Sequence, residues 1–272
     1  MVGNNRPDHS VRKCKTLAKI SLIGAGSVVF ARRLLQDIVC VPELSDSTVS
    51  LMDTDPERLE LMGRFAKKLA SDTGTNIKIE VTPDRREALD GSDYVLTTIR
   101  VGDSFERDIA IPLKYGVDQS VGDTVGPGGV FKALRTAPVL MDICADIEDV
   151  APDATLLNYT NPMAIACWAI AEATDVPTIG LCHSVQHTTA DLAEYIGVPT
   201  ESVKGWVAGI NHLAWFLRFE VDGVDAYPRL FEAMENPEIY SRDTVRFEVM
   251  RQFGYFVTES TRHMSEYTPY FR

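Results

Sequence analysis

Short apolar runs alternate with helix-like stretches along the first two thirds of the chain. Residues 18–24 form a short apolar run that ends at a glycine, and a helix-like stretch follows over 28–41. A second apolar run over 49–52 ends at Asp53, and a proline then suits the first turn of a helix expected over about 56–70. This order predicts a strand, a turn, a helix and a second strand, which together form a βαβ unit.

The same alternation continues towards residue 200. Three further strands are expected over 94–99, 155–159 and 178–181, and a long helix over about 130–150 should follow the glycine-rich loop at 122–129. A helical segment follows each strand, which predicts a parallel sheet with helices on both faces and right-handed crossovers. The fold class expected is therefore α/β, with a doubly wound parallel sheet of the Rossmann type.

The pattern changes near residue 200. Two longer β-rich runs, over 206–210 and 213–221, are closed by Asp222-Gly223, which is a hairpin signal. We therefore expect a Rossmann domain over 17–200 that binds a dinucleotide. A second, α+β domain for substrate and metal is expected over 201–272, in a partial and shortened form.

The charge balance and the cysteines exclude several classes of function. The formal net charge of −12 would repel phosphate backbones and anionic lipid, so neither nucleic acid nor a membrane surface is an expected partner. Residues 1–16 are expected to be a loose leader without a signal-like apolar core. The five cysteines show no C-x-x-C spacing, which disfavours a disulfide framework and a structural zinc site. The composition indicates a reduced, cytoplasmic protein.

A glycine turn directly follows the first predicted strand and opens a helix. At Gly24-Ala-Gly26-Ser27, backbone N–H groups can approach a pyrophosphate at a helix N-terminus. Asp53, at the end of the second strand, can accept hydrogen bonds from ribose hydroxyls and would repel a 2′-phosphate, which favours NAD over NADP. Val29 stands where the third glycine of the fingerprint is usual, so a turn that uses glycine only for steric reasons is the alternative.

Polar residues also stand at the ends of later strands. Asn158 and Asn161 could orient a hydroxylated substrate, or could form turns before the next helix. Cys182 and His212 are a plausible pair of ligands for a divalent metal, but a buried thiol and a hydrogen-bonded core histidine explain them equally well. Asp123 could serve as an acid, as a partner of a metal ligand or as a loop cap.

At these residues the chain resembles the NAD- and Mn²⁺-dependent family 4 glycoside hydrolases, and its pattern is close to that of their α-galactosidases. The Cys-His-Ser-Val string at 182–185 resembles the version in α-galactosidases, whereas members that act on phospho-glycosides carry Asn or Asp after the cysteine. The resemblance covers almost the whole chain from Lys19 onward. The matching stretches are 24–30, 51–58, 111–116, 126–136, 158–164, 181–186, 209–215 and 266–271.

The resemblance implies an enzyme that hydrolyses α-galactosides with NAD and Mn²⁺ as cofactors. The implied reaction oxidises C3 of the sugar, removes the C2 proton, eliminates the aglycone, adds water and returns the hydride, without the usual pair of carboxylates. The resemblance assigns Cys182 and His212 as metal ligands and Asn161 as a contact to a substrate hydroxyl. Ligand softness alone would favour zinc or iron at a Cys/His pair, so Mn²⁺ is implied only by the resemblance.

The resemblance also indicates which residues move protons. Tyr267 is the expected base at C2, with Tyr270 as the alternative, and a neighbouring cation would have to lower its pKa. Either His183 or Asp123 would protonate the leaving oxygen. Both choices for the acid stay open at this point.

Other functions are compatible with parts of the pattern. An α-glucosidase or α-glucuronidase would keep the family and change the sugar. A lactate- or malate-type dehydrogenase would need a histidine and an arginine for a 2-hydroxy acid, for which Arg100 and Arg107 are available. Family members usually continue beyond the point where this chain stops, so a natural short form, part of a longer protein and a non-catalytic NAD-binding remnant are all considered. An assembly of two or four copies is expected.

Overall fold

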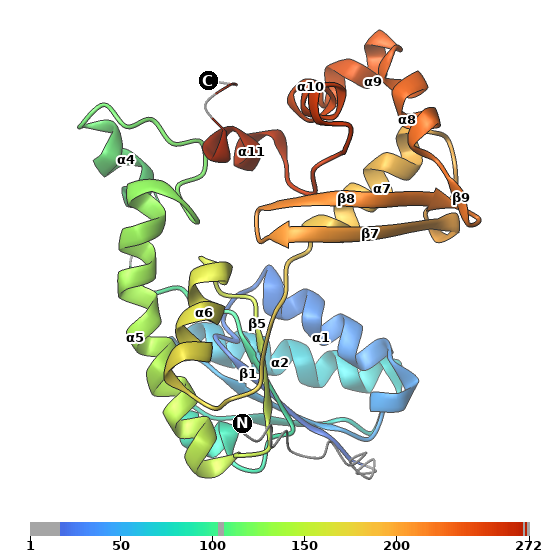
Figure 1. Cartoon of the computed structure of the whole chain (residues 1–272). Coiled ribbons are helices and arrows are strands. Elements are labelled where there is room, and N and C mark those ends of the chain that lie inside the picture. Colours follow the sequence, from blue (N-terminus) through green and yellow to red (C-terminus); the bar gives the residue numbers. More distant parts are fainter. Residues whose placement is uncertain (1–16, 103–105, 269, 271–272) are drawn as a thin grey trace, which may run out of the picture. The chain divides into compact units, whose positions relative to one another are not determined.

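The computed structural model describes residues 17–102, 106–268 and 270 (Figure 1). The predicted leader over 1–16 lies outside the described residues, as do Pro269 and Phe271 of the last matching stretch. By contacts between residues the chain divides into two compact units. The first contains the residues up to Thr98 together with Asp149–Thr155, and the second contains Ile99–Glu148 and Leu156–Arg272. The domain boundary near residue 200 stays a prediction.

A six-stranded sheet has the strand order β3-β2-β1-β4-β5-β6. Strand β1 pairs in parallel with β2 and with β4, and β2–β3 and β5–β6 are parallel as well. This arrangement confirms the predicted Rossmann-type sheet, in which the strand order reverses beside β1. The strands are β1 (Lys19–Ile23), β2 (Thr48–Met52), β3 (Lys78–Val81), β4 (Tyr94–Thr97), β5 (Thr155–Asn158) and β6 (Thr178–Gly180).

Helices follow most of these strands, as the alternation predicted. In the first unit, α1 and α2 contact each other and lie side by side (Figure 1). The helices are α1 (Phe30–Cys40), α2 (Pro56–Thr73), α3 (Arg85–Leu89), α4 (Arg107–Leu113), α5 (Gly126–Val150), α6 (Met163–Ala173), α7 (Ser184–Tyr195), α8 (Tyr227–Met234), α9 (Pro237–Arg242), α10 (Thr244–Phe253) and α11 (Thr261–Tyr267), with short 3-10 turns at Pro42–Leu44 and Thr200–Ser202.

Local chemistry fixes the ends of α2. The Asp55 side chain accepts hydrogen bonds from the backbone N–H groups of Glu57 and Arg58, and Pro56 occupies the first turn. Gly74 ends the helix in a left-handed conformation, with φ 68°. The helix therefore runs slightly beyond the range predicted from the sequence.

The core of the first unit is built from the apolar runs that predicted the strands. Leu22 on β1, Leu51 on β2 and Leu35 on α1 are fully buried, each with 0% exposure. Burying one such side chain contributes about 1.5–3 kcal/mol relative to leaving it in water. The buried residues of α1, which include Leu35, lie on its apolar face, and its polar face is exposed. The apolar face is therefore the side of the helix that packs inward.

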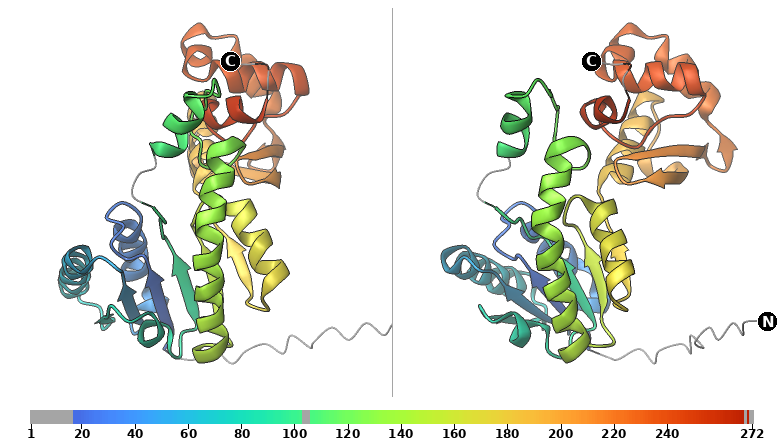
Figure 2. Two further views of the ribbon diagram at one scale, coloured as in Figure 1. Left: turned by 90° about the vertical axis from the view of Figure 1, so that its left-hand side faces the viewer. Right: turned by 60° about the vertical axis from the view of Figure 1, so that its left-hand side comes forward.

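The second unit contains an antiparallel ribbon. Strand β7 (Val203–Ile210) pairs with β8 (Leu213–Val221), and β8 pairs with the short β9 (Val224–Asp225). Asp222 and Gly223 join β8 to β9 with φ 51° and 81°, which confirms the predicted hairpin signal. Helices α8 to α10 gather beside this ribbon (Figure 2). They enclose an aromatic core with buried Phe216, Phe219 and Phe247.

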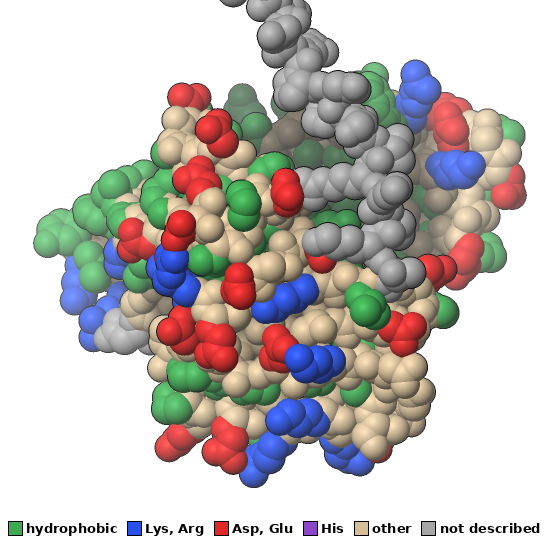
Figure 3. Space-filling model, turned by 90° about the horizontal axis from the view of Figure 1, so that it is seen from below, with side chains coloured by type: hydrophobic (Ala, Val, Ile, Leu, Met, Phe, Trp, Pro, Cys, Tyr) green, Lys and Arg blue, Asp and Glu red, His purple; other side chains and the backbone are tan. Residues whose placement is uncertain are grey.

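Charged side chains are spread over one face of the molecule. Acidic and basic side chains are interspersed on the face drawn in Figure 3, as on an ordinary charged surface. Among the helices of the described ranges, none has the length and apolar character needed to cross a bilayer.

Candidate functional site

The glycine turn after β1 is closed against the end of β2. The backbone N–H groups of Gly24 and Ala25 both donate to the Met52 carbonyl oxygen at 3.0 Å. The Gly26 N–H donates to Asp53 Oδ2 at 2.7 Å. A Cβ atom on Gly26 would lie 2.8 Å from Asp53 Oδ2 and 2.9 Å from Arg58 Cβ. Glycine is therefore required at this position by a close approach of the Asp53 side chain.

The start of α1 has no side-chain cap. The Val29 position makes no side-chain cap hydrogen bond, and the Ala31 N–H donates to the Ser27 carbonyl oxygen at 2.8 Å. Asp53 Oδ1 also accepts from the Asp55 N–H at 2.9 Å, which holds the carboxylate at the end of β2. Val29 is 60% exposed, so replacing the third fingerprint glycine places a side chain in solvent rather than between the helix and the sheet.

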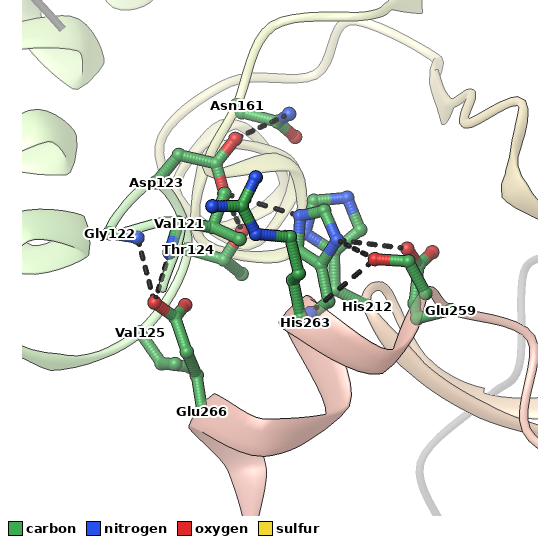
Figure 4. Close-up of polar contacts among 12 residues, drawn as sticks. Val121, Gly122, Asp123, Thr124, Val125, Asn161, His212, Glu259, His263 and Glu266 are labelled. Atoms are coloured by element: carbon green, nitrogen blue, oxygen red, sulfur yellow. Dashed lines mark hydrogen bonds and ion pairs between the residues drawn. The ribbon is translucent and has the colours of Figure 1, made fainter. Parts of the chain in front are cut away.

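A cluster of potential metal ligands lies in the second unit (Figure 4). Cys182 is the second residue after β6, and His212 lies in the turn between β7 and β8. Glu259 lies just before α11, and His263 lies in the first turn of that helix. Asp123 comes from the loop before α5. Two overlapping groups have their ligand atoms within 4.8 Å of one another. These groups are Cys182, His212 and Glu259, and Asp123, His212 and His263.

His212 is the residue that both groups share. It is only 4% exposed and has a left-handed backbone with φ 65°. Its Nδ1 atom lies 2.6 Å from Thr124 Oγ1, and its ring centroid lies 4.3 Å from that of His263. Burial, and next the charge of His263, lower the pKa of His212 to about 4. The imidazole is therefore neutral at pH 7, the form that binds metal ions.

Asp123 is held as a carboxylate by cations and hydrogen bonds. Burial raises its pKa, but the His263 hydrogen bond and the Lys132 charge outweigh burial and lower the pKa to about 2. Lys132 Nζ lies 3.9 Å from Asp123 Oδ2. The side-chain amide of Asn161, the predicted substrate contact, donates to the same oxygen at 3.3 Å. Asn161 is thus brought to the metal-binding cluster through Asp123.

Glu259 connects the cysteine with the second histidine. Its Oε1 lies 3.9 Å from Cys182 Sγ and its Oε2 lies 3.5 Å from His263 Nδ1. Glu259 is 4% exposed, and this burial raises the pKa of its carboxyl group against the opposing effects of Ser184 and His263. Cys182 Sγ also lies 3.0 Å from Ser184 Oγ. A buried acid beside a thiol and an imidazole is a set of donors that a cation would satisfy.

The residues predicted to move protons, Tyr267, Tyr270 and His183, differ in their burial and in their contacts. Tyr267 donates its hydroxyl hydrogen to the Asn211 carbonyl oxygen at 3.1 Å. Burial, followed by the charges of nearby carboxylates including Asp123, raises the pKa of Tyr267 above its usual value. Tyr270 is 70% exposed. His183 is exposed at the start of α7, where its ring lies 4.8 Å from that of His187.

The structure brings Asp123, Asn161, Cys182 and His212 into one cluster. It adds Glu259 and His263, which the sequence analysis did not single out. Glu259 lies before the Ser260 cap and His263 lies inside α11, so no helical spacing relates them; the only signal in the sequence was two possible ligands within five residues of each other. The chemical roles of all these residues stay predictions.

Two protein-family models match the chain. The model described as family 4 glycosyl hydrolase matches residues 19–198, and the model of the family 4 glycosyl hydrolase C-terminal domain matches residues 207–272. These two matches cover most of the chain.

The curated relatives of the chain include α-galactosidases and an α-glucosidase. An α-galactosidase of Bacillus subtilis (strain 168) is 44% identical over 259 residues, which are 94% of this chain and 60% of that protein. An α-galactosidase of Rhizobium meliloti (strain 1021) is 40% identical over 93% of this chain and 53% of its own length. An α-glucosidase of Erwinia rhapontici is 35% identical over 77% of this chain and 48% of its own length. The chain therefore spans only about half to three fifths of these relatives.

Solved structures show the same similarity. The lplD protein of Bacillus subtilis has a TM-score of 0.82 at 30% identity, covering 94% of this chain and 64% of that one. The 6-phospho-β-glucosidase of Thermotoga maritima, solved with manganese, NAD⁺ and glucose-6-phosphate, has a TM-score of 0.76 at 26% identity. That match covers 92% of this chain and 60% of the other.

Proposed function

Since this chain belongs to family 4 of the glycosyl hydrolases, we propose that it hydrolyses α-galactosides with NAD and Mn²⁺ as its cofactors. The observation that carries the proposal is the convergence of Cys182, His212 and Glu259, whose ligand atoms lie within 4.8 Å of one another. Galactose is favoured over other sugars because the α-galactosidases share 44% and 40% identity with the chain.

The first unit fits an NAD cofactor. Gly24, Gly26 and Ser27 would hold the pyrophosphate, because the space beside Gly26 has no room for a Cβ and the start of α1 lacks a side-chain cap. Asp53 would accept hydrogen bonds from the ribose hydroxyls, since its oxygens retain lone pairs beyond those used by two backbone N–H groups.

The cluster in the second unit fits a divalent cation. Cys182 and His212 alone offer soft and borderline donors, which suit zinc or iron better than manganese. Glu259 adds a carboxylate oxygen, the donor type that manganese prefers, and its burial leaves its charge in need of compensation. The three donors together therefore fit Mn²⁺ better than the pair that was predicted from the sequence.

When bound, the nicotinamide accepts a hydride from the sugar and the cation stabilises negative charge on sugar oxygens. Asn161 would orient a sugar hydroxyl with its amide. Tyr267 would remove the proton from C2, since a positive charge nearby would lower a pKa that burial and carboxylates now hold high. His183 or Asp123 would donate the proton to the leaving oxygen, and the ionised state of Asp123 favours His183.

Hydrolysis of α-glucosides at the same site is the second candidate function. It is supported by the α-glucosidase that is 35% identical over part of the chain. The two sugars differ in the orientation of one hydroxyl group, so a direct comparison of substrates separates the two candidates.

The test measures release of nitrophenol from p-nitrophenyl α-galactoside and p-nitrophenyl α-glucoside, under a thiol reductant. NAD⁺ and Mn²⁺ are supplied together and then omitted one at a time, after bound nucleotide has been removed from the protein. We expect turnover of the galactoside that needs both additions and that Cys182→Ala abolishes. Cys40→Ala, at an exposed cysteine, is the matched control and should keep full activity. Turnover without NAD⁺, or faster turnover of the glucoside, would overturn the proposal.

A further inference from the structure

We propose that Thr124 is a positioning residue that fixes the tautomer of His212, so that the proton sits on Nδ1 and Nε2 is left to bind the cation. This inference rests on the proposed metal site and deepens it. Thr124 is 4% exposed and lies between Asp123 and His212, at hydrogen-bond distance from both side chains.

The direction of the two hydrogen bonds follows from counting protons. A threonine hydroxyl has one proton to donate, whereas an ionised carboxylate can only accept. Thr124 Oγ1 donates to Asp123 Oδ1 at 2.9 Å, which uses that proton. His212 Nδ1, 2.6 Å from the same Oγ1, must therefore be the donor in the second hydrogen bond. A neutral imidazole with its proton on Nδ1 carries its lone pair on Nε2.

The two hydrogen bonds that join His212, Thr124 and Asp123 form a relay, and the charge of Asp123 sets their direction. Asp123 is surrounded by donors: Lys132 Nζ lies 3.9 Å from Oδ2, and the Asn161 amide donates to the same oxygen, so the carboxylate accepts from all of them. A neutral group at position 123 could donate to the threonine, and the histidine would then be free to take the other tautomer. The relay thus converts a fixed carboxylate charge into a fixed orientation of the imidazole lone pair.

The loop that carries Thr124 is held from several sides. Glu266 Oε1 accepts hydrogen bonds from the backbone N–H groups of residues 121–122, at 2.6 and 2.9 Å (Figure 4). Gln119 donates to the Val125 carbonyl oxygen at 2.8 Å. A Cβ on Gly129 would lie 2.4 Å from the Thr124 carbonyl carbon, so the helix start packs directly against the Thr124 backbone. The hydroxyl is therefore placed by the fold and not by a mobile side chain.

Partners that orient a metal-binding histidine typically change metal affinity by about 10- to 100-fold when they are removed. Thr124→Val keeps the branched shape and removes the hydroxyl, so that neither tautomer of His212 keeps a partner at Nδ1. Thr124→Ser keeps the hydroxyl and removes one methyl group. These two variants separate the relay from the packing of the side chain.

The experiment uses the whole chain with ¹⁵N-labelled histidines, first without metal. Two-bond ¹H–¹⁵N correlations report the tautomer of His212, assigned by its loss in His212→Gln. Binding of Mn²⁺ alone is then measured from the electron paramagnetic resonance signal of the free ion. We expect the Nδ1–H tautomer in the wild-type chain and in Thr124→Ser, with similar Kd values for Mn²⁺. We expect Thr124→Val to lose this tautomer preference and to raise the Kd by about 10- to 100-fold.

An Nε2–H tautomer in the wild-type chain would overturn the inference, as would an unchanged tautomer and Kd in Thr124→Val. Circular dichroism checks that each variant is folded, and should Thr124→Val not fold, the wild-type and Thr124→Ser spectra decide. The tautomer measurement needs no metal, so its outcome is independent of the proposed cation site. That site fails separately if Cys182→Ala binds Mn²⁺ as tightly as the wild-type chain.

Discussion

Glu259 Oε1 lies 3.9 Å from Cys182 Sγ, although the two residues are 77 positions apart in the chain. The contact forms because α11 begins just after Glu259, where the Ser260 side chain accepts a hydrogen bond from the His263 N–H and caps the helix. A hard oxygen donor is thereby placed beside a soft sulfur donor. This combination determines which metal ions the cluster can accept.

Glu259→Gln should weaken Mn²⁺ binding by about tenfold or more, because it removes a negative charge from the cluster and keeps the side-chain shape. The Kd is measured by electron paramagnetic resonance of free Mn²⁺ on the wild-type and variant chains. Glu232→Gln, at an exposed position on α8, is the control and should leave the Kd unchanged. Equal Kd values for Glu259→Gln and the wild-type chain would exclude Glu259 as a ligand.

Gly26→Ala should raise the Kd for NAD⁺ by at least about tenfold, or about 1.4 kcal/mol. The new Cβ would lie 2.8 Å from Asp53 Oδ2, so the carboxylate that is proposed to bind the ribose must move. Gly74→Ala is the control, since its φ of 68° makes alanine strained but nothing lies within 4 Å of the new Cβ. It should cost about 1 kcal/mol of stability and leave the Kd unchanged in titration calorimetry. The reverse pattern would contradict the proposed NAD site.

His212 should make the metal-free chain less stable in mild acid. Its pKa in the folded chain is about 4, below its ordinary value of 6.5. Between these values the unfolded chain binds more protons, so the free energy of unfolding falls as the pH drops through this window. The loss is at most about 3 kcal/mol.

Urea unfolding at several pH values between 4 and 7 measures this effect, and His212→Asn should flatten the decline. The raised pKa of His263, which Asp123 and Glu259 maintain against burial, has the opposite sign and acts above pH 6.5. Asp123, with a pKa near 2, acts only below its ordinary value of 3.8. A decline of the same size in His212→Asn would show that another group causes it.

Arg246→Met should destabilise the second unit by about 3–5 kcal/mol, because it leaves the buried Asp243 carboxylate without its cation. Arg246 Nε donates to Asp243 Oδ1 at 2.7 Å, and the two residues are 6% and 4% exposed. Arg251→Met, in the surface pair with Glu248, is the matched control and should cost about 0–1 kcal/mol. Urea unfolding measures the free energy of unfolding of both variants. Equal losses of this free energy would show that Arg246 does not compensate a buried Asp243 carboxylate.

Asp243 also links this ion pair to the cluster. It accepts a hydrogen bond from Thr261 Oγ1 at 3.1 Å, at the first residue of α11. Glu259 and His263 flank that residue. The loss of stability in Arg246→Met should therefore be accompanied by weaker Mn²⁺ binding, which the Arg251→Met control should not show.

The family and most of the fold could be predicted because their signals are local. Apolar runs with a glycine turn identified β1 and β2, and all strands of the sheet except β3 were expected. Strand β3, Lys78–Val81, alternates charged and apolar residues, and none of its side chains is fully buried. Such alternation is the pattern of a half-exposed strand, so the signal for β3 was present in the sequence, but it is only four residues long and was missed.

The start of α5 shows tertiary structure overriding local propensity. The helix begins at Gly126, before the predicted 130, although glycines disfavour a helix. A Cβ on Gly128 would lie 2.5 Å from the Asp108 carbonyl oxygen, and a Cβ on Gly129 would meet the Thr124 backbone. Glycine is used here because neighbouring backbone leaves no space, which the sequence alone does not reveal.

The candidate site was only partly predictable for the same reason. Cys182 and His212 were proposed from a pair of strand-end motifs and a family resemblance. Glu259 and His263 join them only after β8, α10 and α11 have packed, so no local pattern links them to the cysteine. The relay through Thr124 depends on hydrogen-bond directions, which sequence spacing does not encode.

The cluster has a consequence for unfolding, because its members are distant in the chain. Cys182 and Glu259 are 77 positions apart, and Thr124 and His212 are 88 positions apart. A cation bound to Cys182, His212 and Glu259 would act as a reversible cross-link that closes long loops, and closing them without the folded chain costs conformational entropy. The binding free energy would then be added to the free energy of unfolding, so the ion would help to hold the second unit together.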